Sequence, residues 1–245
     1  MSETVAASPC LAPAWRLQPQ GDRCVLVSLE DDLNESAARR CLALARQIRQ
    51  AGWPGVSDVV PAFTSVAVHY QPQEPGNLDH AELTGRLQAL LAEPLPDTAQ
   101  TGRLIDIPVC YGGIHGPDLA QVAQASGLSE AEVIALHSQT PCTVLMLGFA
   151  PGFAYLGIHD ARLDIPRRAE PRTEVPAGSI AVANRQSVIY PGRLPGGWNI
   201  IGATTLTLFD PAREPAALLQ PGDRLRFVPI TADAFAVARR KAAAP

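Results

Sequence analysis

The sequence is poor in lysine, in aromatic residues and in long hydrophobic runs. Lys241 is the only lysine among 20 basic residues, so arginines supply nearly all of the positive charge. The net charge of −4, with no block of Lys or Arg, argues against nucleic acid or an anionic membrane as a partner. No apolar run approaches the ~18 residues of a membrane-spanning helix, and the N-terminal MSETVAASPCLAPAW lacks the features of a secretory signal. These absences predict a cytoplasmic protein that binds neither nucleic acid nor membrane.

Paired cysteines and the common catalytic motifs are also missing. The five cysteines are widely spaced, which favours reduced thiols over a disulfide framework or a zinc site. Walker A, GxGxxG, GxSxG and HExxH patterns do not occur, and the histidines lack metal-ligand spacing. The sequence therefore predicts no metal site. It also gives no motif for an NTPase, dehydrogenase, serine hydrolase or metalloprotease of the common types.

The N-terminal part has the pattern of an α+β domain. Hydrophobic periodicity predicts strands over 14–18, 23–29, 56–61 and 65–70 and helices over 34–50 and 78–91. Asn34 is the predicted cap of the first helix, and Gly52 is expected to end it. The order ββαββα predicts a sheet with helices on one face, in a domain that covers residues 1–98.

The pattern of predicted elements changes after the proline-rich segment 93–102, which we predict to be a linker. A second domain is expected over 103–232. It begins with a strand at 104–111 and two short helices, and many short strands with Gly/Pro turns follow, TTLTLF at 204–209 among them. This pattern indicates a closed or sandwich-like β domain. Residues 233–245 are predicted to be a C-terminal tail.

Two loops combine glycine, proline and large aromatic rings. One reads GFAPGFAYLG at 148–157, and the other reads PGGWN at 195–199. Such a loop either closes a turn whose rings pack in the core or lines a site that the backbone approaches closely. The candidate substrate-binding residues are Gly148, Phe149, Pro151, Gly152, Phe153, Tyr155, Gly196, Gly197 and Trp198.

Arginines between these loops and one histidine supply the candidate catalytic groups. Arg167, Arg168 and Arg172 stand beside prolines in PRRAEPRTEVPAGS, and prolines restrict the backbone. Guanidinium groups held in this way bind carboxylate or phosphate, although a solvated surface loop has the same composition. If Arg172 lines a site, its loss is expected to abolish turnover and to leave the melting temperature almost unchanged.

His137 ends the second short helix of this domain, where a helix C-terminus stabilises imidazolium. It is either a general acid or base or only a helix cap. The candidate catalytic residues are therefore His137, Arg168 and Arg172.

These motifs occur in an order that resembles a known family. The set is YGG-x-x-GPDL, His137, GF-x-PGF-x-YLG, PRR-x-x-PR-x-x-VPAGS, IYP, PGGW-x-IIG and L-x-PGD-x-x-RF. It resembles the family of 5-oxoprolinase B subunits, which includes the KipI antikinase and is also called allophanate hydrolase subunit 1. The resemblance is tight over 103–230 and looser over 55–70. It implies an α+β N-terminal domain followed by a mainly-β cyclophilin-like barrel.

The resemblance also implies a function within a complex. Together with a KipA-type C subunit and a LamB/YcsF-type A subunit, such a chain would open the lactam 5-oxoproline to glutamate at the expense of ATP. ATP is expected in the assembled complex, and the chain alone is expected to be inactive because it has no nucleotide motif. The alternatives are a KipI-like inhibitor of a sensor histidine kinase, or one component of an allophanate- or urea-type amide hydrolase or carboxyltransferase.

The sequence departs from the family pattern at several positions. Ile114 and His115 follow Tyr-Gly-Gly where the family usually has an acidic residue, and Ala203 stands where an arginine commonly follows IIG. Asn184 and Arg185 replace a glycine-richer stretch. If these positions bind substrate, the chain is a paralogue with another substrate or a binding role.

Overall fold

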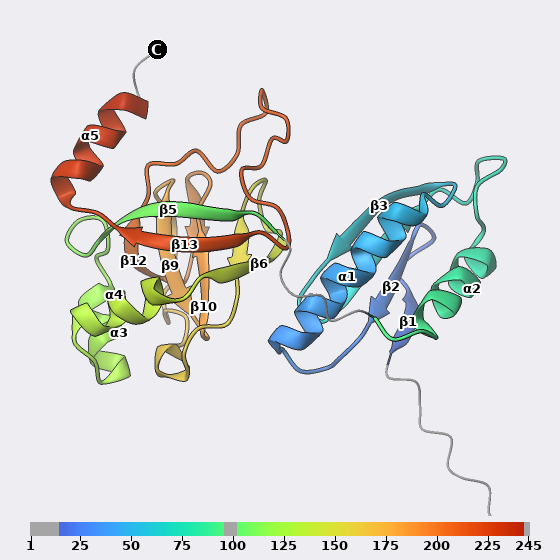
Figure 1. Ribbon diagram of the computed structural model, residues 1–245, viewed down its shortest axis with the longest axis horizontal. Helices are drawn as coiled ribbons and strands as arrows, with labels where there is room; N and C mark the ends of the chain where they lie inside the picture. The colour runs from blue at the N-terminus through green and yellow to red at the C-terminus, as the bar shows by residue number, and fades with distance from the viewer. Residues whose placement is uncertain (1–14, 96–101, 243–245) are drawn as a thin grey trace, which may run out of the picture.

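The computed structural model describes residues 15–95 and 102–242, which form two units that lie side by side (Figure 1). Most of the predicted linker and the end of the predicted tail lie outside the described residues. The domain boundaries at 98, 103 and 232 therefore stay predictions. Within the described residues, no helix has the length and the apolar character needed to cross a membrane.

The N-terminal unit is a four-stranded antiparallel sheet with two helices. Its elements are β1 (Arg16–Pro19), β2 (Cys24–Ser28), α1 (Glu35–Ala51), β3 (Val56–Pro61), β4 (Ser65–Tyr70) and α2 (His80–Leu91), with strand order β1-β2-β4-β3. Helix α1 begins as predicted, because the Asn34 side chain accepts a 2.7 Å hydrogen bond from the Ala37 N–H. It ends at Gly52 in the left-handed conformation. Both helices and the sheet share one apolar core.

The second unit is a closed barrel of seven strands, which confirms the predicted fold class. Its elements are β5 (Leu104–Tyr111), α3 (Leu119–Ser126), α4 (Glu130–Gln139), β6 (Cys142–Leu147), β7 (Ala154–Leu156), a 3₁₀ turn (Ala161–Leu163), β9 (Ser179–Ala183), β10 (Gln186–Ile189), β12 (Asn199–Ala203) and β13 (Arg224–Pro229). The barrel order is β10-β7-β6-β13-β5-β12-β9, in which only the β13–β5 pair is parallel. A separate two-stranded sheet joins β8 (Arg172–Val175) to β11 (Leu194–Gly196).

Strands β9 and β10 are buried on both faces, which explains why residues 180–183 of β9 are apolar without alternation. Ile180, Val182 and Ile189 belong to the barrel core. The residues between them point the other way, because successive side chains of a strand alternate. They build a second apolar cluster on the outside of the barrel, here called the outer cluster: Phe153, Val175, Ala181, Ala183, Val188, Tyr190, Trp198 and Ile200.

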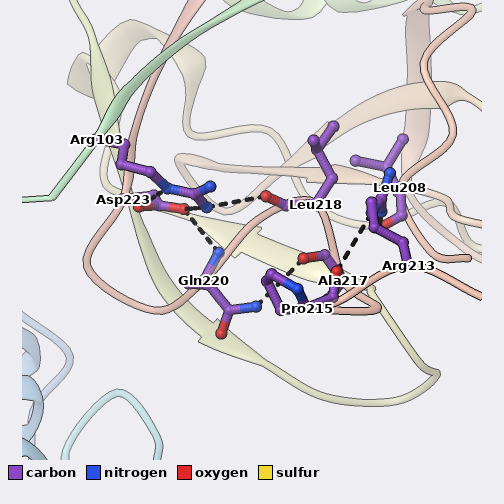
Figure 2. A network of polar contacts seen from close by, with 8 residues as sticks. All are labelled: Arg103, Leu208, Arg213, Pro215, Ala217, Leu218, Gln220 and Asp223. Atoms are coloured by element: carbon purple, nitrogen blue, oxygen red, sulfur yellow. Dashed lines mark hydrogen bonds and ion pairs between the residues drawn. The ribbon is translucent and has the colours of Figure 1, made fainter. Parts of the chain in front are cut away.

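Residues 204–209 do not form the strand that their composition predicts. Phe209 makes one isolated bridge, to Ala217. The Arg213 side chain holds this segment instead (Figure 2), because it donates to the carbonyl oxygens of Leu208 and Pro215 at 3.4 and 3.3 Å.

The start of the barrel chain is tied to the same loop (Figure 2). Arg103 binds Asp223 through Nε at 3.1 Å and donates from Nη2 to the Leu218 carbonyl at 3.0 Å. The β propensity of residues 204–209 is thus not realised, because the segment has no partner strand and its carbonyl oxygens bind the Arg213 side chain.

The segment predicted to be a tail contains a helix, α5 (Ala232–Ala242), at the end of the barrel away from the N-terminal unit (Figure 1). Its Phe235 is buried and packs against the His115 ring. Strands β7, β8 and β11 also lie where the sequence indicated only loops. They are three or four residues long, too short to give a periodic pattern.

Candidate functional site

The loop 148–157 is both a core turn and an exposed surface. The Gly148 N–H donates to the Phe153 carbonyl at 3.1 Å, and the Phe153 N–H donates to the Ala150 carbonyl at 3.0 Å. Gly152 has φ +74, and a Cβ there would lie 2.8 Å from the Cβ of Phe209. The Phe153 ring is buried in the outer cluster, 5.0 Å from the Tyr190 ring between centroids.

Two other rings of this loop face outward. Phe149 is 62% exposed and has φ +72, a conformation that costs free energy for any residue with a Cβ. Strained and exposed positions of this kind are common at functional sites. The half-buried Tyr155 ring meets Phe63 of the N-terminal unit edge-to-face, with centroids 5.8 Å apart. Pro151 is exposed between them.

The second loop lies against the first through the outer cluster. A Cβ at Gly196 would collide with the Tyr190 hydroxyl oxygen, so only glycine leaves room for that ring. Burial raises the pKa of Tyr190 to about 12. Trp198 is buried, and the Arg167 guanidinium lies over its ring in a cation–π contact, with Cζ 5.2 Å from the ring centroid.

A buried carboxylate that the sequence analysis did not single out holds both candidate arginines. The Asp118 side chain is 5% exposed and accepts from Arg172 at 2.8 Å on both oxygens and from Arg168 at 3.1 Å. It also accepts from the Ile200 N–H at 2.7 Å. Asp118 stands at the N-cap of α3 but makes no capping hydrogen bond, because its oxygens point to the arginines.

Asp118 with Arg168 and Arg172, here called the clamp, gives the two arginines a structural role. Asp118 fixes the arginine loop to β12 and to the start of α3, and the Gly197 carbonyl strengthens the fixation by accepting from the Arg168 N–H at 2.7 Å. Arg172 is not the exposed surface arginine on which the expectation of an unchanged melting temperature rested, and its loss would leave a buried carboxylate with one cation fewer. We therefore expect its loss to lower the melting temperature. Two guanidinium groups against one carboxylate still leave one positive charge, and the buried Arg168 Nε has no hydrogen-bond partner.

His137 lies apart from the arginines, inside the barrel. Its Nδ1 lies 2.7 Å from the Tyr111 hydroxyl, and its Nε2 lies 2.8 Å from Ser187 Oγ. The Nε2 of His159 lies 2.6 Å from the same Ser187 oxygen. Burial lowers the pKa of His137 well below its ordinary value and that of His159 to about 4. Both rings are therefore neutral at pH 7, and the imidazolium expected at the helix end does not form.

The structure thus brings most of the candidate residues together. The outer cluster is where the two loops meet Trp198, Arg168 and Arg172. His137 is separated from them by the barrel wall. The sequence signal for Asp118 was its place in GPDL, where an acidic residue before a helix is ordinarily a cap. Nothing in a 50-residue separation indicates the pairing with Arg168.

A barrel of this topology beside an α+β unit is the fold of carboxyltransferase-domain proteins. The sequence model of the family "Carboxyltransferase domain, subdomain C and D" matches residues 15–219. The chain is 44% identical over 209 residues to the B subunit of 5-oxoprolinase from Escherichia coli O157:H7, covering 85% of this chain and 93% of that protein. The corresponding B subunit from Bacillus subtilis is 39% identical over 224 residues, with 89% and 93% covered. The chain belongs to the family of 5-oxoprolinase B subunits.

Solved structures agree with this assignment. The structure of TTHA0988 has a TM-score of 0.73 and 39% identity, and the match covers 85% of this chain. It covers only 40% of TTHA0988, so that protein continues well beyond the part that this chain resembles. The urea amidolyase of K. lactis shares the fold, with a TM-score of 0.70 at 19% identity over 95% of this chain and 16% of that one.

Proposed function

We propose that this chain is one component of an ATP-dependent 5-oxoprolinase that, with a KipA-type C subunit and a LamB/YcsF-type A subunit, opens 5-oxoproline to glutamate. One observation carries the proposal: the chain is 39 to 44% identical to B subunits of 5-oxoprolinases over 93% of their length. The extra length of TTHA0988 supports a partner, since a fused chain and a complex of separate chains can build the same assembly.

The outer cluster is the surface that would meet the substrate or another subunit in this proposal. The net positive charge of Arg168, Arg172 and Asp118 lies next to the second loop, where the Arg168 N–H donates to the Gly197 carbonyl. Phe149 and Tyr155 of the first loop contact Phe153 of the outer cluster. A positive charge held in place before the reaction stabilises an oxyanion that develops during amide opening. Asp118 positions the two arginines and is not itself expected to touch the substrate.

A proton role for His137 would need a relay. The ring has no exposed surface, so a proton would pass through Ser187 Oγ to His159 or through the Tyr111 hydroxyl. His159 lines a cleft of about 370 Å³ whose wall includes Glu35 at the start of α1. The cleft therefore joins the two units of the chain.

ATP belongs to the assembled complex in this proposal. Among the described residues, no group of three His, Cys, Asp or Glu side chains could hold a metal ion. The sequence has no Walker A or GxGxxG motif, so we assign the nucleotide no residues in this chain.

Reconstitution tests the proposal. The three subunits are purified separately, and the formation of ADP and glutamate is measured with 5-oxoproline as substrate. Turnover is expected only when all three are present, and this chain alone is expected to show none. Full turnover in the absence of this chain would overturn the proposal. Turnover of urea or allophanate in place of 5-oxoproline would instead assign the chain to the amide-hydrolase alternative.

A further inference from the structure

A second candidate site lies at the other end of the barrel. A groove of about 530 Å³ separates the barrel rim from α5 and includes no residue of the N-terminal unit or of the outer cluster. The stacked rings of His115 and Phe235, with centroids 4.2 Å apart, fix α5 against the barrel. Helix α5 lies beyond residues 15–219, which the family's sequence model matches.

The groove carries positive charge without an internal counter-charge. Arg193, Arg239 and His115 line it, and none of its lining residues is Asp or Glu. Arg193 already pairs with Glu174 at the surface. Among the described residues, Arg239 has no hydrogen bond or ion pair, so its guanidinium is available to a ligand. Four further residues that carry hydroxyl groups also line the groove: Ser179, Thr204, Thr205 and Thr207.

The walls of the groove are held before any ligand arrives. The Thr204 N–H donates to the Gly178 carbonyl at 2.9 Å, and a Cβ at Gly178 would collide with the Thr204 carbonyl oxygen. Arg213, drawn in Figure 2, donates to the Thr207 and Leu208 carbonyls at 3.4 Å and so shapes the segment that did not become a strand. A preformed groove lowers the cost of ordering a ligand.

The remaining walls are apolar, which limits the kind of anion that fits. Leu206, Phe235, Pro176 and Pro191 line the interior, and Ile114 at the rim is 91% exposed. A carbon skeleton would pack on these groups, and a groove of this volume suits a small molecule. The absence of a carboxylate from the lining disfavours a Mg²⁺-bound nucleotide.

We propose that this groove binds a small organic carboxylate. Its oxygens bind Arg239 and the donors of His115 and the threonines, and its carbon atoms contact Phe235 and Leu206. Three positions where the sequence departs from the family pattern, Ile114, His115 and Ala203, line this groove. The proposal does not depend on the lactamase reaction, because it concerns binding by the single chain.

Calorimetric titration of the full chain tests this inference. The probes are 5-oxoproline, L-glutamate and succinate, with 2-pyrrolidinone as the lactam without a carboxylate and inorganic phosphate as the other anion. At least one carboxylate is expected to bind, and 2-pyrrolidinone at least about tenfold more weakly, since a charged hydrogen bond is lost. Arg239→Ala should weaken the carboxylate about tenfold. Arg240→Ala, on the same helix but outside the groove lining, should leave its affinity unchanged.

The possible results distinguish a lost binding site from a lost fold, and a carboxylate ligand from phosphate. Arg239 is exposed and has no hydrogen bond or ion pair among the described residues, so an unchanged melting temperature of Arg239→Ala would show that the fold is retained. Equal affinity of this variant and the wild type, or no binding of any of the three carboxylates, would overturn the proposal. Binding of phosphate alone, lost in Arg239→Ala, would overturn it in favour of a phosphate ligand. None of these results bears on turnover by the assembled complex.

Discussion

The two arginine clusters on the barrel differ in what surrounds their charge. Arg168 and Arg172 are about three-quarters buried and share the oxygens of Asp118, which is almost fully buried. Arg239, by contrast, projects from α5 over a groove that contains no carboxylate. A cation that already has a buried partner mainly orders the fold, whereas an unpaired cation at a groove is available to a ligand. An arginine-rich loop in a sequence does not distinguish the two cases.

The largest loss of unfolding free energy is expected when Asp118 is replaced. Asp118→Asn keeps an acceptor for the Ile200 N–H but leaves two partly buried arginines without a counter-charge, so it should cost about 3 kcal/mol of unfolding free energy. Urea denaturation measures this loss. The matched control is Asp106→Asn, whose carboxylate pairs with Arg226 in the open and should change stability little. Equal losses in the two variants would contradict the clamp.

Arg172→Ala should lose less, about 2 kcal/mol, because Arg168 and the Ile200 N–H remain on the carboxylate. Arg172→Lys should recover only part of this, since a lysine cannot bind both oxygens at once. Arg226→Ala is the control on the exposed pair. If Arg172→Ala had the melting temperature of the wild type, its pairing with Asp118 would not stabilise the fold, and Arg172 would behave as an exposed surface arginine.

The buried histidines predict a dependence on pH. Burial lowers the pKa of His159 from 6.5 to about 4, so below pH 6.5 the unfolded chain binds a proton that the folded chain does not. Stability is therefore lost as the pH falls, by about 2 kcal/mol between pH 7 and 5 from His159, and His137 acts in the same direction. Chemical denaturation at the two pH values measures the difference. In His159→Asn the difference should shrink, and a difference as large as in the wild type would exclude His159 as its source.

The smallest effect on stability is expected at the exposed ring of the first loop. Phe149→Gly relieves a positive φ and loses only an edge contact with Phe153, so stability should change by no more than about 0.5 kcal/mol. Turnover by the reconstituted complex should fall if Phe149 meets the substrate or a partner. Leu33→Ala, which removes an exposed apolar side chain of the N-terminal unit, is the control. Unchanged turnover in Phe149→Gly would remove this ring from the proposed site.

Much of the fold was predictable from local pattern. Asn34, Gly52 and the Ser129–Glu132 capping box mark helix ends through hydrogen bonds between near neighbours in sequence. The clamp at Asp118 was not predictable, because Arg168 lies 50 residues away in the chain. The segment 204–209 has the composition of a strand, but among the described residues it makes only one isolated bridge, and the nearby Arg213 binds its carbonyl oxygens instead. The position of His137 was predicted, but its neutral state depends on burial that periodicity does not reveal.

One paired measurement tests most directly the contrast between the two arginine clusters. Arg172→Ala and Arg239→Ala are compared side by side for unfolding free energy and for the affinity of the carboxylate that the wild type binds. The account predicts that Arg172→Ala loses about 2 kcal/mol of stability and keeps the affinity of the α5 groove. Arg239→Ala should keep its stability and lose about tenfold in affinity. The reverse assignment, or a loss of both properties in both variants, would contradict it.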